Sequence, residues 1–344
     1  MPATFSRTTA TLIGCGAIAL WALLAMLTAA TGKVPPFELA AMTFAVAGGA
    51  GVASFVWRPG AARALRQRPV VWLVGVGGLF GYHALYFAAL RLAPPAEAGL
   101  IAYLWPLLIV IFSAFLPGEA LRPAHIIGTL LGLAGVVVLI GMRSGGLSLR
   151  LDAVPGYLLA LGCAFVWSSY SVLSRRFGEV PTDAVAGFCL VTALLAAICH
   201  LLFEDTVWPA GASQWLAVAA LGIGPVGLAF YLWDIGVKRG DLRFLGVASY
   251  ASPPLSTSIL VLAGFAAAGW SLAVAACLIV SGAFIAGAQL SGIRKSHALI
   301  SPLTRLSATA GSSQYRPPPC LARNVAPAIA RRPEVTVLGA NRWT

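Results

Sequence analysis

Long apolar runs follow one another along this chain and are separated by short polar loops. The runs predict helices at residues 11–30, 37–57, 70–90, 96–116, 124–141, 155–174, 183–203, 213–236, 243–264 and 269–290. Each run holds about 20 residues, which is enough to cross about 30 Å of hydrocarbon. The runs lack the polar–apolar alternation of barrel strands. The sequence therefore predicts an all-α integral membrane protein with ten transmembrane helices.

The composition supports a membrane protein. Of 344 residues, 59% are hydrophobic and only 10% are charged, whereas a soluble domain carries about 25% charged residues. The first run, from Thr11 to Ala30, is longer than the core of a signal peptide, so we interpret it as an uncleaved span. None of the six cysteines has metal-ligand spacing, and we expect no metal site.

The distribution of Lys and Arg predicts the orientation. With the N-terminus inside, the inner loops hold eleven of these residues and the outer loops four, while the other eight of the 23 follow residue 291. This bias predicts an inner-membrane protein with both termini in the cytoplasm. The formal charge of +12 forms no basic stripe on a soluble domain, so we expect no nucleic-acid partner.

The two halves of the chain repeat a pattern. The segment Tyr103 to Pro106 matches Tyr250 to Pro253 at an offset of 147, and Trp21 matches Trp167 at an offset of 146. A repeat of five spans crosses the membrane an odd number of times, so the second copy must be inverted. The predicted domains are a cytoplasmic N-terminus (1–10), a five-helix repeat (11–141), a periplasmic linker (142–154), a second five-helix repeat (155–290) and a disordered basic cytoplasmic tail (291–344).

The repeat also indicates where a substrate could bind. Pro106 and Pro253 lie near the midplane of matched spans, and interrupted helices in both halves mark substrate sites in transporters. We predict these prolines to be gating or hinge residues. Aromatic and polar side chains at similar depth need a polar cavity or a bonded surrounding, although plain core packing remains an alternative. The predicted substrate-binding residues are Tyr82, His83, Tyr86, Tyr103, Trp105, Trp167, Tyr250 and Ser252.

Charged groups within the spans are few. Asp234 lies near the inner end of its span with Lys238 one turn later, and this spacing favours a structural ion pair over a proton-coupling acid. His83 could sense protons or could be a hydrogen-bonded neutral side chain.

No enzyme signature is present. The chain has no Walker A loop, no HExxH and no GxSxG motif, and no facing acids within the spans. We therefore expect no catalytic residues, no cofactor and no enzyme activity.

The segment from Tyr82 to Val110 resembles the drug/metabolite transporter superfamily of the EamA type. Its specific parts are the stretches PPAEA at 94–98 and YLWPLL at 103–108, and the general pattern covers roughly residues 10–290. The resemblance implies a basket of helices around a central cavity. It also implies alternating-access export of amino acids, aromatic and other neutral ones included, and of related metabolites. The second half departs from the pattern, with Gly-Asp-Leu-Arg at 240–243 in place of PPAEA.

Two other functions remain open at this stage. One is efflux of cationic drugs, because aromatic cages can hold cations. The other is a non-transporting membrane enzyme or scaffold. The expected partners are a small-molecule substrate and the lipid bilayer, while the coupling ion and the oligomeric state stay undetermined by the sequence.

Overall fold

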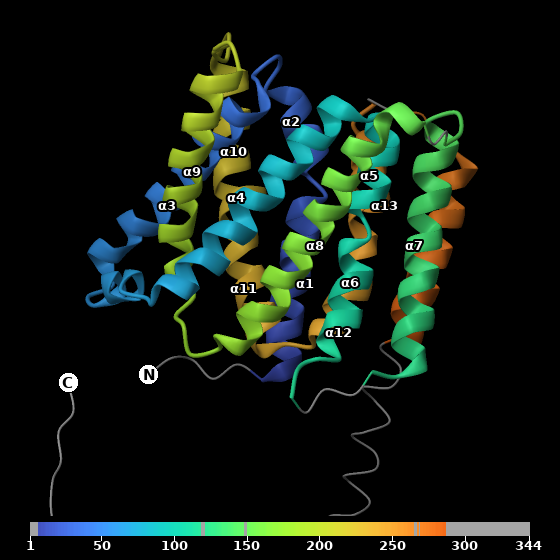
Figure 1. Ribbon diagram of the computed structural model, residues 1–344, viewed down its shortest axis with the longest axis horizontal. Helices are drawn as coiled ribbons and strands as arrows, with labels where there is room; N and C mark the ends of the chain where they lie inside the picture. The colour runs from blue at the N-terminus through green and yellow to red at the C-terminus, as the bar shows by residue number, and fades with distance from the viewer. Residues whose placement is uncertain (1–5, 118–120, 148–149, 265–266, 268, 287–344) are drawn as a thin grey trace, which may run out of the picture. The chain divides into compact units, whose positions relative to one another are not determined.

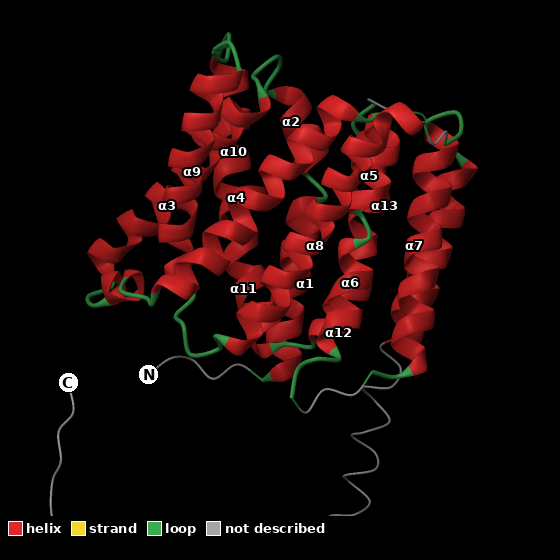
Figure 2. Cartoon of the chain, in the orientation of Figure 1, coloured by secondary structure: helices red, strands yellow, loops and turns green. Residues whose placement is uncertain are grey.

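The computed structural model describes residues 6–117, 121–147, 150–264, 267 and 269–286, which form helices joined by loops and turns (Figure 2). Among these residues, nine helical segments are long and apolar enough to cross a membrane, and Trp270–Ala286 is a shorter apolar helix. These ten segments coincide with the ten predicted spans and confirm the predicted all-helical membrane fold. The predicted tail, 291–344, lies outside the described residues.

Several spans consist of more than one helix. The first half contains α1 (Arg7–Trp21), α2 (Leu24–Ala30), α3 (Pro36–Ala53), η1 (Ser54–Trp57), η2 (Ala61–Leu65), α4 (Pro69–Leu92), α5 (Pro95–Ala102), α6 (Trp105–Ser113) and α7 (Pro123–Arg143). The second half contains η3 (Leu151–Ala153), α8 (Val154–Arg176), α9 (Ala184–Phe203), α10 (Ala212–Ile223), η4 (Gly224–Leu228), α11 (Ala229–Arg239), α12 (Leu242–Ala248), η5 (Ser249–Ala251) and α13 (Ser252–Leu262). Figure 1 shows their arrangement.

The two halves run in opposite directions. Arg7, at the start of α1, forms an ion pair of 3.0 Å with Asp241, which precedes α12. Arg175, near the end of α8, donates a hydrogen bond of 2.7 Å to the carbonyl oxygen of Gly240. The start of α1 and the end of α8 therefore lie at the same end of the helical body, here called the Arg175 end. The first helices of the two halves are thus antiparallel, as an inverted repeat requires.

A different polar cluster marks the opposite end, here called the Glu204 end. The carboxylate of Glu204, just after α9, accepts hydrogen bonds of 3.1 Å from the backbone N–H groups of Phe37 and Glu38. These donors belong to the first turn of α3, which has no intrahelical partners for them. Arg91, near the end of α4, lies 3.3 Å from the same carboxylate. Glu204 therefore ties the start of α3 to the ends of α4 and α9.

Helices of the two halves pack directly against each other. The largest contacts join α3 to α9, α4 to α8 and α1 to α11, and α3 and α9 lie side by side in Figure 1. Small residues allow this close approach. A Cβ atom added to Gly78 of α4 would clash with the ring of Tyr170 on α8. The halves therefore form one interdigitated body.

Candidate functional site

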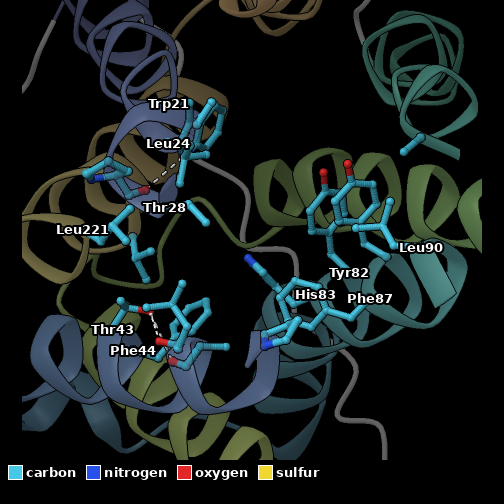
Figure 3. A pocket seen from close by; sticks show the side chains of 18 of the residues that line it. Trp21, Leu24, Thr28, Thr43, Phe44, Tyr82, His83, Phe87, Leu90 and Leu221 are labelled. Carbon is cyan, nitrogen blue, oxygen red and sulfur yellow. Dashed lines mark hydrogen bonds between the residues drawn. The ribbon is translucent and has the colours of Figure 1, made fainter. Parts of the chain in front are cut away.

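A cavity of about 750 Å³ lies between the two halves (Figure 3). Its walls come from α1, α2, α3 and α4, from the α5–α6 and α10–α11 regions, and from α8 and α13. The lining includes Val34, Pro36 and Leu90, which are near the Glu204 end, and it also includes tryptophans at mid-span. Pockets of about 300–1,000 Å³ are typical of small-molecule sites. The cavity is therefore of a size suited to a metabolite, and it extends toward the Glu204 end.

The structure brings most of the predicted site residues together. Seven of the eight predicted substrate-binding residues line the cavity, namely Tyr82, His83, Tyr86, Tyr103, Trp105, Trp167 and Ser252. They come from four spans that are far apart in the sequence. Their convergence was inferred from depth alone, and a role in binding stays a prediction.

Tyr250 differs from the other seven predicted residues, and its role in binding stays a prediction. Its side chain is fully buried and is absent from the cavity wall. The ring packs against α7, where a Cβ atom added to Gly132 would clash with it. A matched position in an inverted repeat gives equal depth, but the rotation of the helix decides which way a side chain points. Here that rotation turns Tyr250 away from the cavity.

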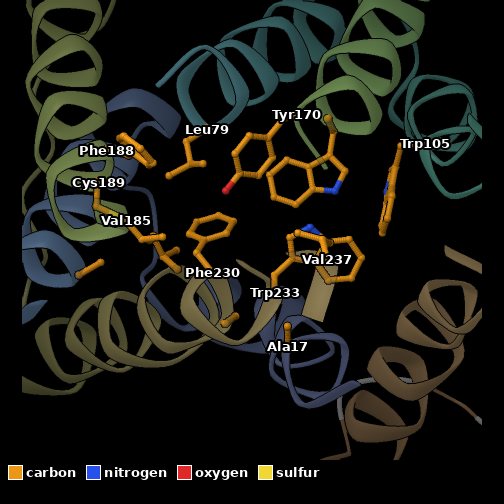
Figure 4. Packing of buried hydrophobic residues seen from close by; sticks show 14 of the residues in the cluster. Ala17, Leu79, Trp105, Tyr170, Val185, Phe188, Cys189, Phe230, Trp233 and Val237 are labelled. Atoms are coloured by element: carbon orange, nitrogen blue, oxygen red, sulfur yellow. The ribbon is translucent and has the colours of Figure 1, made fainter. Parts of the chain in front are cut away.

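A layer of tryptophans forms the floor of the cavity. The ring centroid of Trp21 lies 6.3 Å from that of Trp105 and 5.7 Å from that of Trp167. The fully buried Trp233 lies beneath, 5.1 Å from Trp21 and 5.9 Å from Trp105. Figure 4 shows Trp105, Trp233 and Phe230 in this packed layer. The edge-to-face geometry of most of these pairs is the arrangement that aromatic quadrupoles favour.

Two of the four indole N–H groups of this floor, those of Trp21 and Trp233, donate hydrogen bonds within the protein. Trp21 donates a hydrogen bond of 3.1 Å to the carbonyl oxygen of Pro225, and Trp233 donates one of 3.1 Å to the Ser171 hydroxyl. Pro225 belongs to the single-turn π-helix η4, between α10 and α11. Such π-helical turns occur often at functional sites. The floor is therefore held by hydrogen bonds as well as by ring packing.

The side wall of the cavity combines aromatic rings with a histidine. The rings of Tyr82 and Tyr86 are stacked with centroids 6.1 Å apart, as expected for residues at i and i+4 on one helix face. His83 lies edge-on to Phe44, with centroids 5.1 Å apart, and its Nδ1 atom is 2.7 Å from the carbonyl oxygen of Leu79. Because that carbonyl can only accept, Nδ1 carries the proton in neutral His83, and Nε2 is left as an acceptor.

Matched spans are interrupted at matched positions. The helix of the fourth span breaks between α5 and α6, and that of the ninth span breaks at η5 between α12 and α13. Pro106 and Pro253 each occupy the second position of the helix after the break, where the missing N–H group costs no helical hydrogen bond. The Tyr103 side chain is hydrogen-bonded to Ser252, so the two breaks meet. The predicted interruptions are present, and a hinge role stays a prediction.

Charged side chains lie outside the cavity wall. None of the described residues that line the cavity is Asp, Glu, Lys or Arg. Asp234 is buried and forms the predicted ion pair with Lys238 at 2.8 Å, and it also accepts a hydrogen bond from Thr182. The wall is therefore aromatic and polar but uncharged.

Sequence reasoning missed part of the wall and a buried polar cluster. Trp21, Phe44 and Phe87 line the cavity, and of these three only Trp21 carried a signal, its match to Trp167 in the repeat. Near the cavity mouth, His200 lies 3.2 Å from the Glu204 carboxylate and 3.9 Å from that of Glu38. His200 and Glu204 follow Glu38 by 162 and 166 positions in the chain, so no local sequence pattern connects them to Glu38.

Comparisons with known proteins agree with this architecture. The model of the EamA-like transporter family matches residues 8–141 and 154–288. The aromatic amino acid exporter YddG of Ancylobacter novellus is 64% identical over 281 residues, which cover 82% of this chain and 98% of that protein. The aromatic amino acid exporter YddG of Escherichia coli is 25% identical, over 79% of this chain and 95% of that protein.

A solved crystal structure is also similar. It is 62% identical in sequence with a TM-score of 0.81, and the match covers 84% of this chain and 99% of that one. The family match spans both helical halves. It confirms the expectation that the chain is a transporter and not an enzyme. With two matched segments and a helical body built around a central cavity, the chain belongs to the EamA-like transporter family of the drug/metabolite transporter superfamily.

Proposed function

We propose that this protein exports aromatic amino acids, and other neutral amino acids with apolar side chains, across the inner membrane by alternating access. The observation that carries the proposal is the cavity, whose wall is aromatic and polar but bears no charged residue. The 64% identical relative is named an aromatic amino acid exporter, which supports the same substrate class.

An aromatic floor favours an aromatic substrate. The rings of Trp21, Trp105 and Trp167 present faces and edges to whatever lies above them. An aromatic contact contributes about 0.5–1.5 kcal/mol beyond the effect of buried area. Two such contacts, about 1–3 kcal/mol together, would therefore distinguish tryptophan or phenylalanine from alanine by about fivefold or more, since 1.4 kcal/mol corresponds to about tenfold.

A neutral wall suits a zwitterion with no net charge. The α-ammonium needs acceptors, and His83 offers Nε2 because its Nδ1 proton is used by Leu79. The α-carboxylate needs donors and positive potential. Trp105 and Ser252 line the cavity at the first positions of α6 and α13, whose N-terminal ends are favourable for negative charge. A side chain with its own charge would find no counter-ion in the wall.

The same observation weakens the alternative of cationic drug efflux. A buried cation is stabilised best by a carboxylate, and the described lining residues contain none. Asp234 lies within a span but outside the cavity wall. Its carboxylate forms an ion pair with Lys238 and accepts a hydrogen bond from Thr182.

We also propose that the Arg175 end faces the cytoplasm, with both termini there. The support is the excess of Lys and Arg in the loops of that side, eleven against four. In this orientation the cavity extends toward the periplasm. The linker at 142–154, the repeat boundaries 11–141 and 155–290, and the cytoplasmic tail 291–344 remain part of this proposal. A reporter fused after residue 148 should be active in the periplasm, and activity in the cytoplasm would reverse the assignment.

Counterflow into proteoliposomes tests the proposal. Vesicles loaded with unlabelled L-phenylalanine should accumulate labelled L-tryptophan and L-phenylalanine, with slower uptake of L-alanine and none of L-lysine or L-glutamate above empty vesicles. Uptake of L-lysine at the rate of L-tryptophan would contradict the role of the neutral wall. Movement of a quaternary ammonium compound without any amino acid transport would establish the drug-efflux alternative instead.

A further inference from the structure

The two ends of the helical body differ in how their helices pack. The comparison is between α8 and α11 at the Arg175 end and α2 and α4 at the Glu204 end. At the Arg175 end, α8 packs against α11. At the Glu204 end, α2 and the C-terminal half of α4 face each other across the cavity. In Figure 3, Leu24 and Thr28 lie on one side of the space, and Tyr82, Phe87 and Leu90 lie on the other. One end of the site is therefore sealed, and the cavity reaches the other end.

Hydrogen bonds from α8 make the seal. The Arg175 guanidinium donates to the carbonyl oxygen of Val237 at 3.1 Å and to that of Gly240 at 2.7 Å. The last carbonyl groups of a helix have no intrahelical partners, and a cation beside them is favourable. One turn deeper, Trp233 donates its indole N–H to the Ser171 hydroxyl. Arg175 thus fastens the end of α8 to the end of α11.

The inverted repeat identifies the counterparts of these positions. With Trp21 matched to Trp167, Ser171 corresponds to Ala25 and Arg175 corresponds to Ala29. The ends of α4 and α11, Leu92 and Arg239, match at an offset of 147. By the same offset, Trp233 corresponds to Tyr86 and Val237 corresponds to Leu90. All four counterparts, Ala25, Ala29, Tyr86 and Leu90, line the cavity.

We propose that these matched positions form two alternating gates of different chemistry. In the conformation described here, the polar gate of Ser171, Arg175, Trp233 and Val237 is closed. In the opposite conformation, Ala25 and Ala29 meet Tyr86 and Leu90 and close the Glu204 end, while Arg175 releases the two carbonyl groups. The proposal rests on the chain being an alternating-access transporter and is independent of which molecule it carries.

The difference in chemistry sets the resting conformation. The polar gate is held by charge-assisted hydrogen bonds, which are stronger than neutral ones. Its counterpart has alanine where Arg175 stands and therefore lacks a charged donor at this position. Further bonds reinforce the polar gate, because Lys238 donates to the carbonyl oxygen of Val180 at 2.9 Å and Thr182 bonds Asp234 at 2.7 Å. Without substrate, the protein therefore rests with the Arg175 end sealed.

Cross-linking tests the proposal. In a full-length chain whose six native cysteines are replaced by serine or alanine, the pair Ala29→Cys and Leu90→Cys reports closure of the Glu204 end. A short bismaleimide should link this pair slowly in the parent. The additional change Arg175→Gln should speed linkage about tenfold, as expected for loss of a charge-assisted bond.

The matched control is Arg150→Gln, at the other end of the α8 segment. Arg150 forms a local ion pair with exposed Asp152, so linkage should not change in this variant. The proposal would be overturned if the parent and the Arg175→Gln variant linked at equal rates. It would also be overturned if neither protein linked at all.

A reciprocal measurement needs no change at Arg175. Once the cysteine pair is linked, amide hydrogen exchange at residues 172–182 and 236–242 should lose its protection, because closing one gate opens the other. Retained protection there would overturn the proposal even if linkage occurs. Neither measurement involves transport, so a wrong substrate class would leave both results unchanged.

Discussion

Tyr103 and Tyr250 occupy matched positions in the two halves, each just before a helix interruption, yet they have different surroundings. Tyr103 lines the cavity and bonds Ser252, whereas Tyr250 is buried against Gly132 of α7. The wall as a whole shows the same inequality, because most of its residues come from the first half. In an inverted repeat the two halves exchange environments during alternating access. In the conformation described here, the two matched positions therefore differ: Tyr103 lines the cavity and Tyr250 packs against a neighbouring helix.

The largest expected effect separates these two tyrosines. Tyr250→Ala removes a fully buried ring and should lower the free energy of unfolding by about 3–5 kcal/mol. Tyr103→Ala empties part of a cavity wall and should cost far less, while it weakens substrate binding. Thermal unfolding in detergent and substrate binding, measured for both variants, would check this. A stable Tyr250→Ala protein that has lost binding would mean that Tyr250, and not only Tyr103, serves the substrate.

The next effect concerns the floor that both halves build. Trp105→Ala and Trp167→Ala should each weaken binding of aromatic amino acids about two- to tenfold, since one aromatic contact is worth about 0.5–1.5 kcal/mol. Binding of L-alanine should change less. Trp72→Ala is the control, because Trp72 packs on Phe188, outside the cavity wall. If Trp72→Ala shifts selectivity as much as the floor variants do, the effect comes from packing.

A smaller effect is expected at the interruptions. Pro106→Ala and Pro253→Ala permit continuous helices across the breaks before α6 and α13. The transport rate should fall about threefold, equivalent to about 0.7 kcal/mol, while thermal stability is kept. The two variants should behave alike if the breaks are equivalent hinges. A defect in only one of them would extend the inequality of the tyrosines to the prolines, and full activity in both would remove the hinge role.

The smallest effect should come from a single hydroxyl. Tyr82→Phe keeps the stacked ring beside Tyr86 and removes one polar group from the wall. Apparent affinity should change by no more than about twofold, because a neutral hydrogen bond contributes only about 1 kcal/mol and water can replace it in an open cavity. Titration of the purified variant checks this. A tenfold loss would identify the Tyr82 hydroxyl as a direct substrate contact.

The sequence predicted helices and depth well, because both depend on local patterns. Apolar runs set the spans, Pro106 and Pro253 marked the interruptions, and the spacing of Tyr82 and Tyr86 placed them on one face. Rotation about a helix axis depends on tertiary packing instead. Depth matching therefore included Tyr250, and it overlooked Phe44, which packs against His83.

Polar contacts between distant segments were equally beyond local patterns. Nothing near Glu204 indicates that its carboxylate bonds the first turn of α3, and nothing near Arg175 indicates that it bonds the end of α11. The i, i+4 pair of Asp234 and Lys238 was predictable because a helix alone brings such residues together.

If an uncharged aromatic cavity selects the substrate, the floor tryptophans should determine which amino acids are transported. The most direct test is the ratio of initial transport rates for L-tryptophan and L-alanine in proteoliposomes, compared between the wild type and Trp167→Ala. The wild type should favour L-tryptophan, and Trp167→Ala should reduce the ratio about two- to tenfold while L-alanine transport continues. An unchanged ratio in an active, folded variant would contradict the claim.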